Sequence, residues 1–542
     1  MKKSVIIFFL CVIAFFANNG TILPDIMESR NIITAREMVY DGHWMVPTMN
    51  GELRLEKPPL PTWIAAGVEK VMPDNINAQR AMAGIAAMIW VVFFYLLGEK
   101  ITRNKNYALV ATLLFMTCYN VVLMGRTASW DIYCHALMMV AIYLMYRGFY
   151  ENDRKYLWFP LAGVFLGLSF MSKGPVSFYT LLLPFLACVF FFKKADMKGK
   201  WLPLVLMIII CIAISSWWYA YILIFDHNAA QHVINKESSS WVDYNVRPWW
   251  YYWRFFLETG VWSLLMVTTL AIPYWKNRIE KVGMKREYLF AMGWTLVALV
   301  LMSAMPEKKP RYLLPMMVPC CYAMAFVLEY YIFHNCKEKS ECIIYYINTG
   351  LITLVCFALP VILYVMFYSK HTISLVEFLF LTTVIWTITG VLVYSTIRWK
   401  PLTFVCSIAA LFASAELFMM PLIGDVANNP KFKSIKETRD MTILKGVPFY
   451  YITKEDLRIE MVYEANRKIR PLNTDNKQAV IKALPCVMLT HKRISEELPS
   501  DLLQKIDTVY IGFYDDNRWP KGNRNYNPAF LNYMTLLKLK QK

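Results

Sequence analysis

Charged residues are scarce in this sequence, and its cysteines do not follow the spacing of metal sites. Only 18% of the 542 residues are charged, whereas soluble globular proteins have about 25%. The 12 cysteines include no CxxC pair, so neither a zinc ribbon nor a disulfide framework is indicated, and we expect buried small hydrophobes. Low-complexity tracts and internal repeats are also lacking, which excludes collagens, coiled coils and repeat arrays.

Long runs of apolar residues make up much of the sequence. The sequence is 57% apolar and 15% aromatic. A helix needs about 20 apolar residues to cross a membrane, so we predict an all-α polytopic membrane protein with about 13 transmembrane helices. The predicted spans are 4–23, 79–98, 107–124, 132–149, 157–171, 175–192, 202–224, 253–275, 287–305, 311–333, 343–367, 374–396 and 401–423. The first is interpreted as a retained span, because no small-residue cleavage site follows it.

Lys and Arg gather in alternate loops. If the N-terminus is cytoplasmic, the loops that carry 193–200 and 276–286 are cytoplasmic, as the positive-inside rule requires. The net charge of +18 then reflects such loops and contact with anionic membrane lipid. No basic face with interleaved aromatics is present, so nucleic acid is not an expected partner. An odd number of spans places the C-terminus on the periplasmic side.

Three regions follow from this topology. Residues 1–424 are predicted to form the transmembrane catalytic domain, in which 24–78 is a first periplasmic loop with two interfacial helices. Residues 425–542 alternate short apolar runs with helix-like polar stretches, which predicts a periplasmic soluble α/β domain.

Candidate functional residues lie in the loops on the outer side. They are Glu28, Arg30, Glu56, Lys57, Arg126, Asp131, Lys173, Trp249, Tyr251, Lys309, Arg311 and Tyr312. Lys and Arg suit a lipid-linked phosphate donor, and a carboxylate can act as general base on an acceptor hydroxyl. The expected chemistry is a displacement at the sugar C1, with cations stabilising the charge that develops on the departing phosphate.

Each feature also has a structural interpretation. Glu28–Arg30 and Glu56–Lys57 are also typical of exposed ion pairs, and 307–311 of contact with lipid headgroups. The aromatic run 249–252 is also typical of an interfacial aromatic belt. The histidines are scattered, which does not favour a metal role for any one of them. Asp131 stands out, because a carboxylate at the end of a span is costly unless it is paired or functional.

These motifs resemble the GT-C class of integral-membrane glycosyltransferases. The resemblance is to bacterial transferases that move 4-amino-4-deoxy-arabinose from undecaprenyl phosphate onto lipid A, and to protein O-mannosyltransferases. The matching pieces are Glu28-x-Arg30, Ala35-Arg36-Glu37-Met38, Gly42-x-Trp44-x-Val46-Pro47, Leu55-Glu56-Lys57-Pro58, Arg126 with Asp131, Lys173-Gly174, Pro248-Trp249-Trp250-Tyr251-Tyr252 and Lys309-Pro310-Arg311-Tyr312. They cover roughly residues 20–320.

The resemblance implies a polyprenyl-phosphate-sugar donor, a periplasmic active site and inversion at the anomeric carbon. The family's first catalytic Asp corresponds to Met27 here, so the principal acid becomes Glu28, or Asp25 after a local shift. Asp131 matches the second acid and Lys57 the phosphate-contacting Lys.

The resemblance also concerns a metal site. Glu56 matches a Glu that can hold a metal together with a later Glu-His, which here is Glu237-Ser238. We therefore expect no required cofactor, with a divalent metal at Glu56 and Glu237 as an open possibility.

Three functions remain open from the sequence. We expect an inverting glycosyltransferase acting on a lipid A, glycan or protein acceptor. The alternatives are a lipid-linked-sugar transporter or flippase, and a surface-polysaccharide ligase or polymerase. Transporters usually carry ionisable groups near the bilayer midplane, whereas the predicted spans here are nearly free of charge.

Overall fold

The computed structural model describes residues 3–228, 231, 245–334, 338–424 and 429–540. The chain forms two compact units. The first, here called the membrane unit, comprises Met1–Thr21, Glu56–Pro61 and Asn75–Ile423. The second, here called the sheet unit, comprises Ile22–Leu55, Thr62–Asp74 and Gly424–Lys542.

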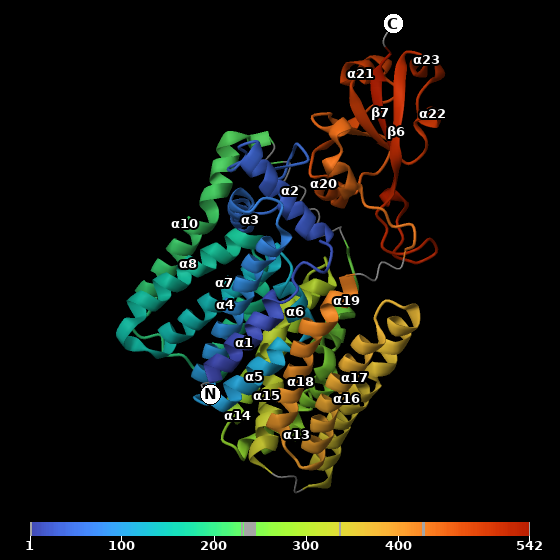
Figure 1. Ribbon diagram of the computed structural model, residues 1–542. Helices are drawn as coiled ribbons and strands as arrows, with labels where there is room; N and C mark the ends of the chain where they lie inside the picture. Colours follow the sequence, from blue (N-terminus) through green and yellow to red (C-terminus); the bar gives the residue numbers. More distant parts are fainter. Residues whose placement is uncertain (1–2, 229–230, 232–244, 335–337, 425–428, 541–542) are drawn as a thin grey trace. The chain divides into compact units, whose positions relative to one another are not determined.

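The membrane unit is built from apolar helices (Figure 1). They are α1 (Lys3–Phe16), α4 (Ile76–Thr102), α5 (Lys105–Met116), α6 (Tyr119–Gly125), α7 (Trp130–Tyr150), α8 (Lys155–Lys173), α9 (Leu183–Cys188), α10 (Trp201–Phe225), α12 (Ser263–Thr269), α13 (Ile272–Glu280), α14 (Lys285–Ala304), α15 (Met317–Phe333), α16 (Lys339–Met366), α17 (Leu375–Ile397), α18 (Pro401–Ser414) and α19 (Met420–Gly424). Irregular helical turns η4 (Trp249–Trp262) and η5 (Pro310–Met316) precede α12 and α15.

Every predicted span overlaps helical structure, although not every one is a straight crossing. Eight helices of the described residues are long and apolar enough to cross a membrane, and up to ten if each bent pair is one span. The pair α5 and α6 is bent by 72°, and the pair that joins 249–269 to α13 is bent by 85°. The polytopic helical fold is therefore confirmed, while the count of thirteen crossings stays a prediction.

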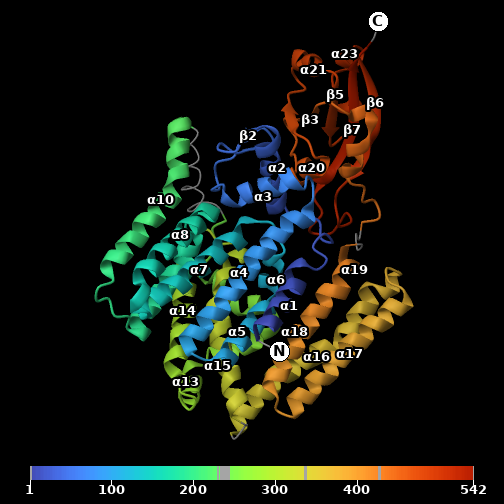
Figure 2. The ribbon, with the colours of Figure 1, turned by 60° about the vertical axis from the view of Figure 1, so that its left-hand side comes forward.

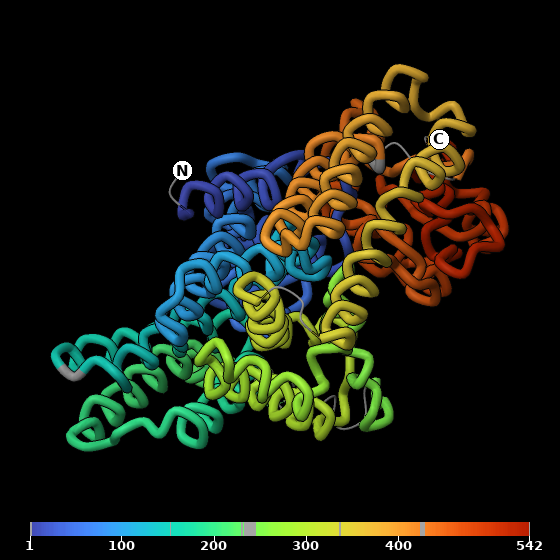
Figure 3. Tube along the Cα trace, turned by 90° about the horizontal axis from the view of Figure 1, so that it is seen from below, coloured from blue at the N-terminus to red at the C-terminus, as the bar shows by residue number. Residues whose placement is uncertain are grey.

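Close ring packing holds the middle of the membrane unit together. The ring of Phe94 on α4 stacks on Phe115 of α5 and on Tyr322 of α15, with centroids 4.4 Å and 4.2 Å apart. Buried aromatic pairs of this kind add to the free energy gained by burying apolar surface. At opposite edges of the unit, α8 lies beside α10 and α16 beside α17 (Figures 2 and 3).

The sheet unit contains a five-stranded sheet in the order β4-β3-β5-β7-β6. Its strands are β3 (Phe449–Ile452), β4 (Ile469–Leu472), β5 (Cys486–Thr490), β6 (Ile506–Asp515) and β7 (Leu531–Leu539). β3 pairs in parallel with β4 and β5, whereas β7 is antiparallel to β5 and β6. The parallel pairs are joined through α20 (Ile459–Ala465) and α21 (Lys477–Ala483). The predicted C-terminal α/β domain is thus confirmed.

Most of the first loop packs with the C-terminal segment, which differs from the predicted boundary. The loop holds α2 (Ile26–Tyr40), the short pair β1 (Thr48–Met49) and β2 (Glu52–Leu53), and α3 (Leu60–Val71). α2 packs on α20, and the Asn50 side chain exchanges hydrogen bonds with the backbone of Ile469 at 2.7 and 2.8 Å. Such contacts between distant segments leave no local signal in the sequence.

The cysteines follow the expectation only in part. Cys118, Cys320 and Cys321 are buried free thiols of the membrane unit. Cys406 is exposed, and Cys342 is disulfide-bonded. For these last two residues the expectation of buried small hydrophobes is wrong.

Candidate active site

Two neighbouring helices of the membrane unit bring an acid and a base together. Asp131 lies in the first turn of α7, and Lys173 is the last residue of α8, which Gly174 ends with φ +78°. α7 and α8 pack along each other, and the Asp131 carboxylate forms an ion pair with the Lys173 ammonium. These residues are only 1% and 7% exposed. A buried pair is costly to form unless other polar groups surround it.

A third element, η5, supplies those polar groups. The Tyr312 ring centroid lies 5.2 Å from the Lys173 Nζ and 5.6 Å from the Lys309 Nζ, within the range of cation–π attraction. Lys309 pairs with Glu307 at 2.5 Å, and the Tyr312 hydroxyl donates to the same carboxylate at 3.4 Å. Three parts of the chain that are far apart in the sequence thus form one polar cluster.

Arg311 adds a third cation to this cluster. It lies near enough to Asp131 and Lys173 to interact electrostatically with both. Within the described part of the chain its guanidinium forms no ion pair, and its buried Nε has no hydrogen-bond partner. Three cations therefore face the carboxylates of Asp131 and Glu307. Among these five residues the cations outnumber the carboxylates, and a phosphate is a suitable anion for a guanidinium.

Tyr252 belongs to this site, although the sequence had named it only within the aromatic motif 248–252 and not as a candidate site residue. Its hydroxyl accepts a hydrogen bond from the Lys309 backbone N–H at 2.9 Å and lies 3.2 Å from the Lys309 carbonyl oxygen, to which it donates. The predicted platform residues lie differently: Trp249 is 56% exposed and packs on Trp253, and Tyr251 stacks with Arg254. The aromatic run had drawn attention to this segment but not to the tyrosine that touches the site.

Arg126 does not join the cluster around Asp131. Its guanidinium pairs with Glu416 at 2.9 Å and donates to the carbonyl oxygens of Ala14 and Ala17 at the end of α1. Arg126 and Glu416 are both largely buried. Arg126 therefore has a structural role in fixing the end of α1, and the substrate-binding role predicted for it stays a prediction.

Glu56 and Lys57 belong to the membrane unit, although the loop on either side of them belongs to the sheet unit. Both side chains are half-buried. The predicted phosphate-contacting Lys57 is thus part of the same compact body as Asp131, Lys173 and Arg311.

Asp25, Glu28 and Arg30 lie in the sheet unit, at the start of α2. Asp25 and Glu28 form a capping box: the Asp25 carboxylate accepts from the Glu28 backbone N–H at 2.8 Å, and the Glu28 carboxylate accepts from the Asp25 N–H at 3.3 Å. Glu28 is only 2% exposed. The pair has a clear structural role, and its catalytic role stays a prediction.

A different set of residues has the spacing of metal ligands. One ligand atom each from Glu37, Asp41 and His43 lies within 4.8 Å of the others, in the sheet unit. Asp41 is already paired with Lys468 at 2.8 Å, and Glu37 accepts from Thr48 and Gly51. Of the predicted metal pair, Glu56 is described and Glu237 lies outside the described residues.

Comparison with known sequences finds glycosyltransferases. Residues 56–219, which include Lys57, Asp131 and Lys173, match the family described as dolichyl-phosphate-mannose-protein mannosyltransferase. The undecaprenyl phosphate-alpha-4-amino-4-deoxy-L-arabinose arabinosyl transferase of Pseudomonas savastanoi pv. phaseolicola is 23% identical over 327 residues, which are 57% of each protein. A relative of the same description from Pseudomonas fluorescens is 26% identical over 57% of this chain and 54% of its own length. The chain therefore matches less than two thirds of these relatives.

Comparison with solved structures extends the likeness to almost the whole chain. The crystal structure of ArnT from Cupriavidus metallidurans bound to undecaprenyl phosphate has a TM-score of 0.69, covering 98% of this chain and 97% of that one at 13% identity. The chain therefore has the fold of ArnT and, over residues 56–219, the sequence pattern of the mannosyltransferase family, which confirms the resemblance to GT-C glycosyltransferases that its motifs had indicated.

Proposed function

We propose that this chain is an inverting glycosyltransferase that moves a sugar from a polyprenyl-phosphate donor onto lipid A, or onto a glycan or protein acceptor. The observation that carries the proposal is the buried Asp131–Lys173 pair with the Arg311 guanidinium near it. The matched relatives are named for an undecaprenyl-phosphate-linked sugar, which supports the choice of donor.

The cations provide the phosphate site of the proposed reaction. Arg311 presents a planar guanidinium that suits two phosphate oxygens, while Lys173 and Lys309 are held in place by Asp131 and Glu307. These groups stabilise the negative charge that grows on the polyprenyl phosphate as it leaves. Lys57 is the further cation that the resemblance assigns to the phosphate.

A carboxylate completes the reaction as general base. The acceptor hydroxyl gives its proton to the carboxylate and its oxygen bonds to the sugar C1. The bond between C1 and the phosphate oxygen breaks, and its electron pair leaves with the polyprenyl phosphate. Attack opposite the leaving group inverts C1. Asp131 and Glu28 are the candidates for the base, with Asp25 as the neighbour that positions Glu28.

The proposed setting is the periplasmic face of a bacterial inner membrane. The apolar helices support a multi-pass membrane protein, and the charge of the loops supports a cytoplasmic N-terminus and a periplasmic sheet unit. The scheme needs no metal, and a divalent ion at Glu56 and Glu237 stays a separate hypothesis.

Mass spectrometry tests the proposal directly. Envelope lipids and glycoproteins of cells with and without the chain should differ by one added sugar, and Asp131→Asn should abolish the difference while the protein still inserts. A purified chain that instead moves labelled lipid-linked sugar across liposomes, with no acceptor product, would make it a flippase.

The phosphate site has its own test. Arg311→Gln should weaken binding of undecaprenyl phosphate, measured by native mass spectrometry, by about 10- to 100-fold, because a charge-assisted contact is worth roughly 1.5–3 kcal/mol. Arg398→Gln, in a predicted cytoplasmic loop, is the matched control and should bind as the parent does. Equal binding by both variants would exclude Arg311 from the donor site.

A further inference from the structure

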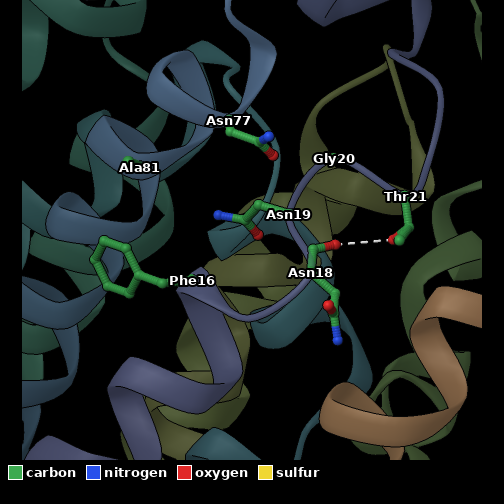
Figure 4. Close-up of a pocket in the computed structure, with 7 residues that line it drawn as sticks. All are labelled: Phe16, Asn18, Asn19, Gly20, Thr21, Asn77 and Ala81. Atoms are coloured by element: carbon green, nitrogen blue, oxygen red, sulfur yellow. Dashed lines mark hydrogen bonds between the residues drawn. The ribbon is translucent and has the colours of Figure 1, made fainter.

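A polar pocket at the end of α1 is not used by the proposed reaction. It is a cavity of about 390 Å³ lined by Phe16, Asn18, Asn19, Gly20, Thr21, Asn77 and Ala81, all in the membrane unit (Figure 4). Pockets that hold small ligands are of about 300–1,000 Å³. In the close-up, the side chains of Asn19, Asn77 and Phe16 surround the same space.

The pocket offers hydrogen bonds without charge. Its lining contains three carboxamides and one hydroxyl, and no Asp, Glu, Lys or Arg. The Asn19 amide is held in place, because its Nδ2 donates to the Phe15 carbonyl oxygen at 2.7 Å. A neutral polar lining of this kind suits a ligand that can both donate and accept hydrogen bonds.

Charged side chains bind the backbone around the pocket, and they already have partners. Arg80 donates to the Asn19 carbonyl at 2.5 Å, and Arg126 pairs with Glu416 while it binds the last turn of α1. Asn18 donates to the carbonyl oxygens of Glu416 and Leu417 at 2.8 and 3.1 Å. A phosphate would therefore find no free cation in the lining. A neutral ligand loses less on leaving water.

Gly20 keeps the pocket open. A Cβ at this position would lie 2.7 Å from the Asn77 Oδ1, so a larger residue would push the Asn77 amide away. The Phe16 ring supplies an apolar wall opposite the amides. A sugar ring has hydroxyl groups that donate and accept hydrogen bonds, and it also has a face of C–H groups. The amides of the pocket can bind the hydroxyl groups, and an aromatic ring is a common partner of the C–H face.

We propose that this pocket binds an uncharged, hydroxyl-rich saccharide ring, separately from the phosphate-binding cluster. The short segment 126–131 connects the two sites. Arg126 at its start donates a hydrogen bond to the end of α1, and Asp131 at its end belongs to the cluster. That the ring is the sugar of a substrate rests on the proposed function, whereas the binding itself does not.

Binding to the full chain in phosphatidylcholine nanodiscs tests the proposal. The probe is methyl β-D-glucopyranoside, observed by saturation-transfer-difference NMR, with inorganic phosphate added as a charged competitor. The parent chain should saturate with the sugar, and phosphate at equal concentration, which the cation cluster can bind, should not displace the sugar. Asn77→Leu and Ala81→Leu, which remove an amide and fill the cavity, should each weaken sugar binding at least 10-fold.

Two controls make the outcome unambiguous. Asn106→Leu also replaces an exposed Asn in the first turn of a helix, outside the pocket, and should leave binding unchanged. Asp131→Asn should abolish transfer but keep sugar binding, so failure of the transferase proposal and of the pocket proposal can be told apart. Unchanged binding in both pocket variants, an absence of sugar binding by the parent, or displacement of the bound sugar by phosphate would each overturn the inference.

Discussion

At the scale of single residues, the buried ion pair between Asp131 and Lys173 should respond most strongly to the loss of one partner. With so little of either side chain exposed, removing one partner leaves the other charge buried and uncompensated, which costs about 3–5 kcal/mol. Replacing both by neutral groups avoids that penalty. The effects of the two single changes on stability should therefore not add.

This non-additivity is measurable. Asp131→Asn and Lys173→Met should each lower the unfolding temperature in detergent, and the double variant should recover much of the loss, with a coupling of about 1–3 kcal/mol. Transfer activity should stay absent in all three. Recovery of activity in the double variant would show that the pair is structural only.

Some of the site residues could be predicted from the sequence, and others could not. Asp131, Lys173 and Arg311 could be selected because charge next to a span is rare and costly. Arg126 has the same local signature, yet its partner Glu416 lies 290 positions away in the chain. Tyr252 could not be told from its aromatic neighbours, since only its contact with Lys309 distinguishes it.

Asp516 gives the sheet unit a pH dependence. Burial raises the pKa of its carboxyl from 3.8 to about 7, and hydrogen bonds from Ser434 and Ile435 offset only part of this. When folding raises the pKa of a carboxyl, its contribution to stability is fully present below the pKa of the unfolded state. That contribution is lost as pH rises through the pKa of the folded state, which is about 7 here. The sheet unit should therefore be less stable at pH 8 than at pH 5.

Hydrogen exchange in the full chain can isolate this residue. Peptides from 429–540, corrected for the intrinsic pH dependence of exchange, should lose protection between pH 5 and pH 8 by an amount of order 2 kcal/mol. Asp516→Asn should flatten that change. A variant that keeps the parent's full pH slope would assign the slope to another group.

At the scale of elements, two glycines set the distance between α8 and α10. A Cβ on Gly163 would lie 2.5 Å from the Met207 carbonyl oxygen, and one on Gly167 would lie 2.6 Å from the Ile214 Cβ. The spacing Gly-x-x-x-Gly lets the helix backbones approach closely in a membrane. Because Lys173 ends α8, this packing also positions the site.

Gly163→Val should therefore destabilise the chain by about 1–3 kcal/mol through overpacking and lower the transfer rate by displacing the end of α8. Gly350→Val is the matched control, because a Cβ at Gly350 meets nothing within 4 Å. Its effect should stay within about 0.5 kcal/mol. Equal unfolding temperatures for the two variants would contradict the close approach of α8 and α10.

Helix positions were the easiest elements to predict, whereas their breaks were not. The run 107–124 contains no charged residue, yet α5 ends at Met116 and α6 turns away by 72°. Hydropathy measures whether a segment prefers lipid, but not where its axis bends. Thr117, whose hydroxyl accepts from the Trp262 indole at 2.7 Å, lies at this break, and no property of the sequence points to that partner.

At the scale of the whole molecule, the sheet unit is assembled from segments at both ends of the chain. Asp74 joins these segments through ion pairs: it pairs with Arg36 at 2.5 Å and with Arg439. Arg36 also donates to the Tyr463 carbonyl at 2.9 Å. The sequence predicted a loop and a separate C-terminal domain, because Arg439 and Tyr463 lie hundreds of residues from their partners Asp74 and Arg36.

Asp74→Asn should therefore loosen both segments of the sheet unit together. Two guanidiniums would lose their shared carboxylate, and because Asp74 is one third exposed the expected cost is about 1–2 kcal/mol, below that of a fully buried pair. Hydrogen exchange in the full chain should then quicken roughly 5- to 30-fold in peptides from 26–40 and from 459–472 alike. Asp501→Asn, which breaks an exposed pair with Lys477 in the same unit, should leave both sets of peptides unchanged. Faster exchange in only one segment would mean that the two segments fold independently and that Asp74 does not tie them.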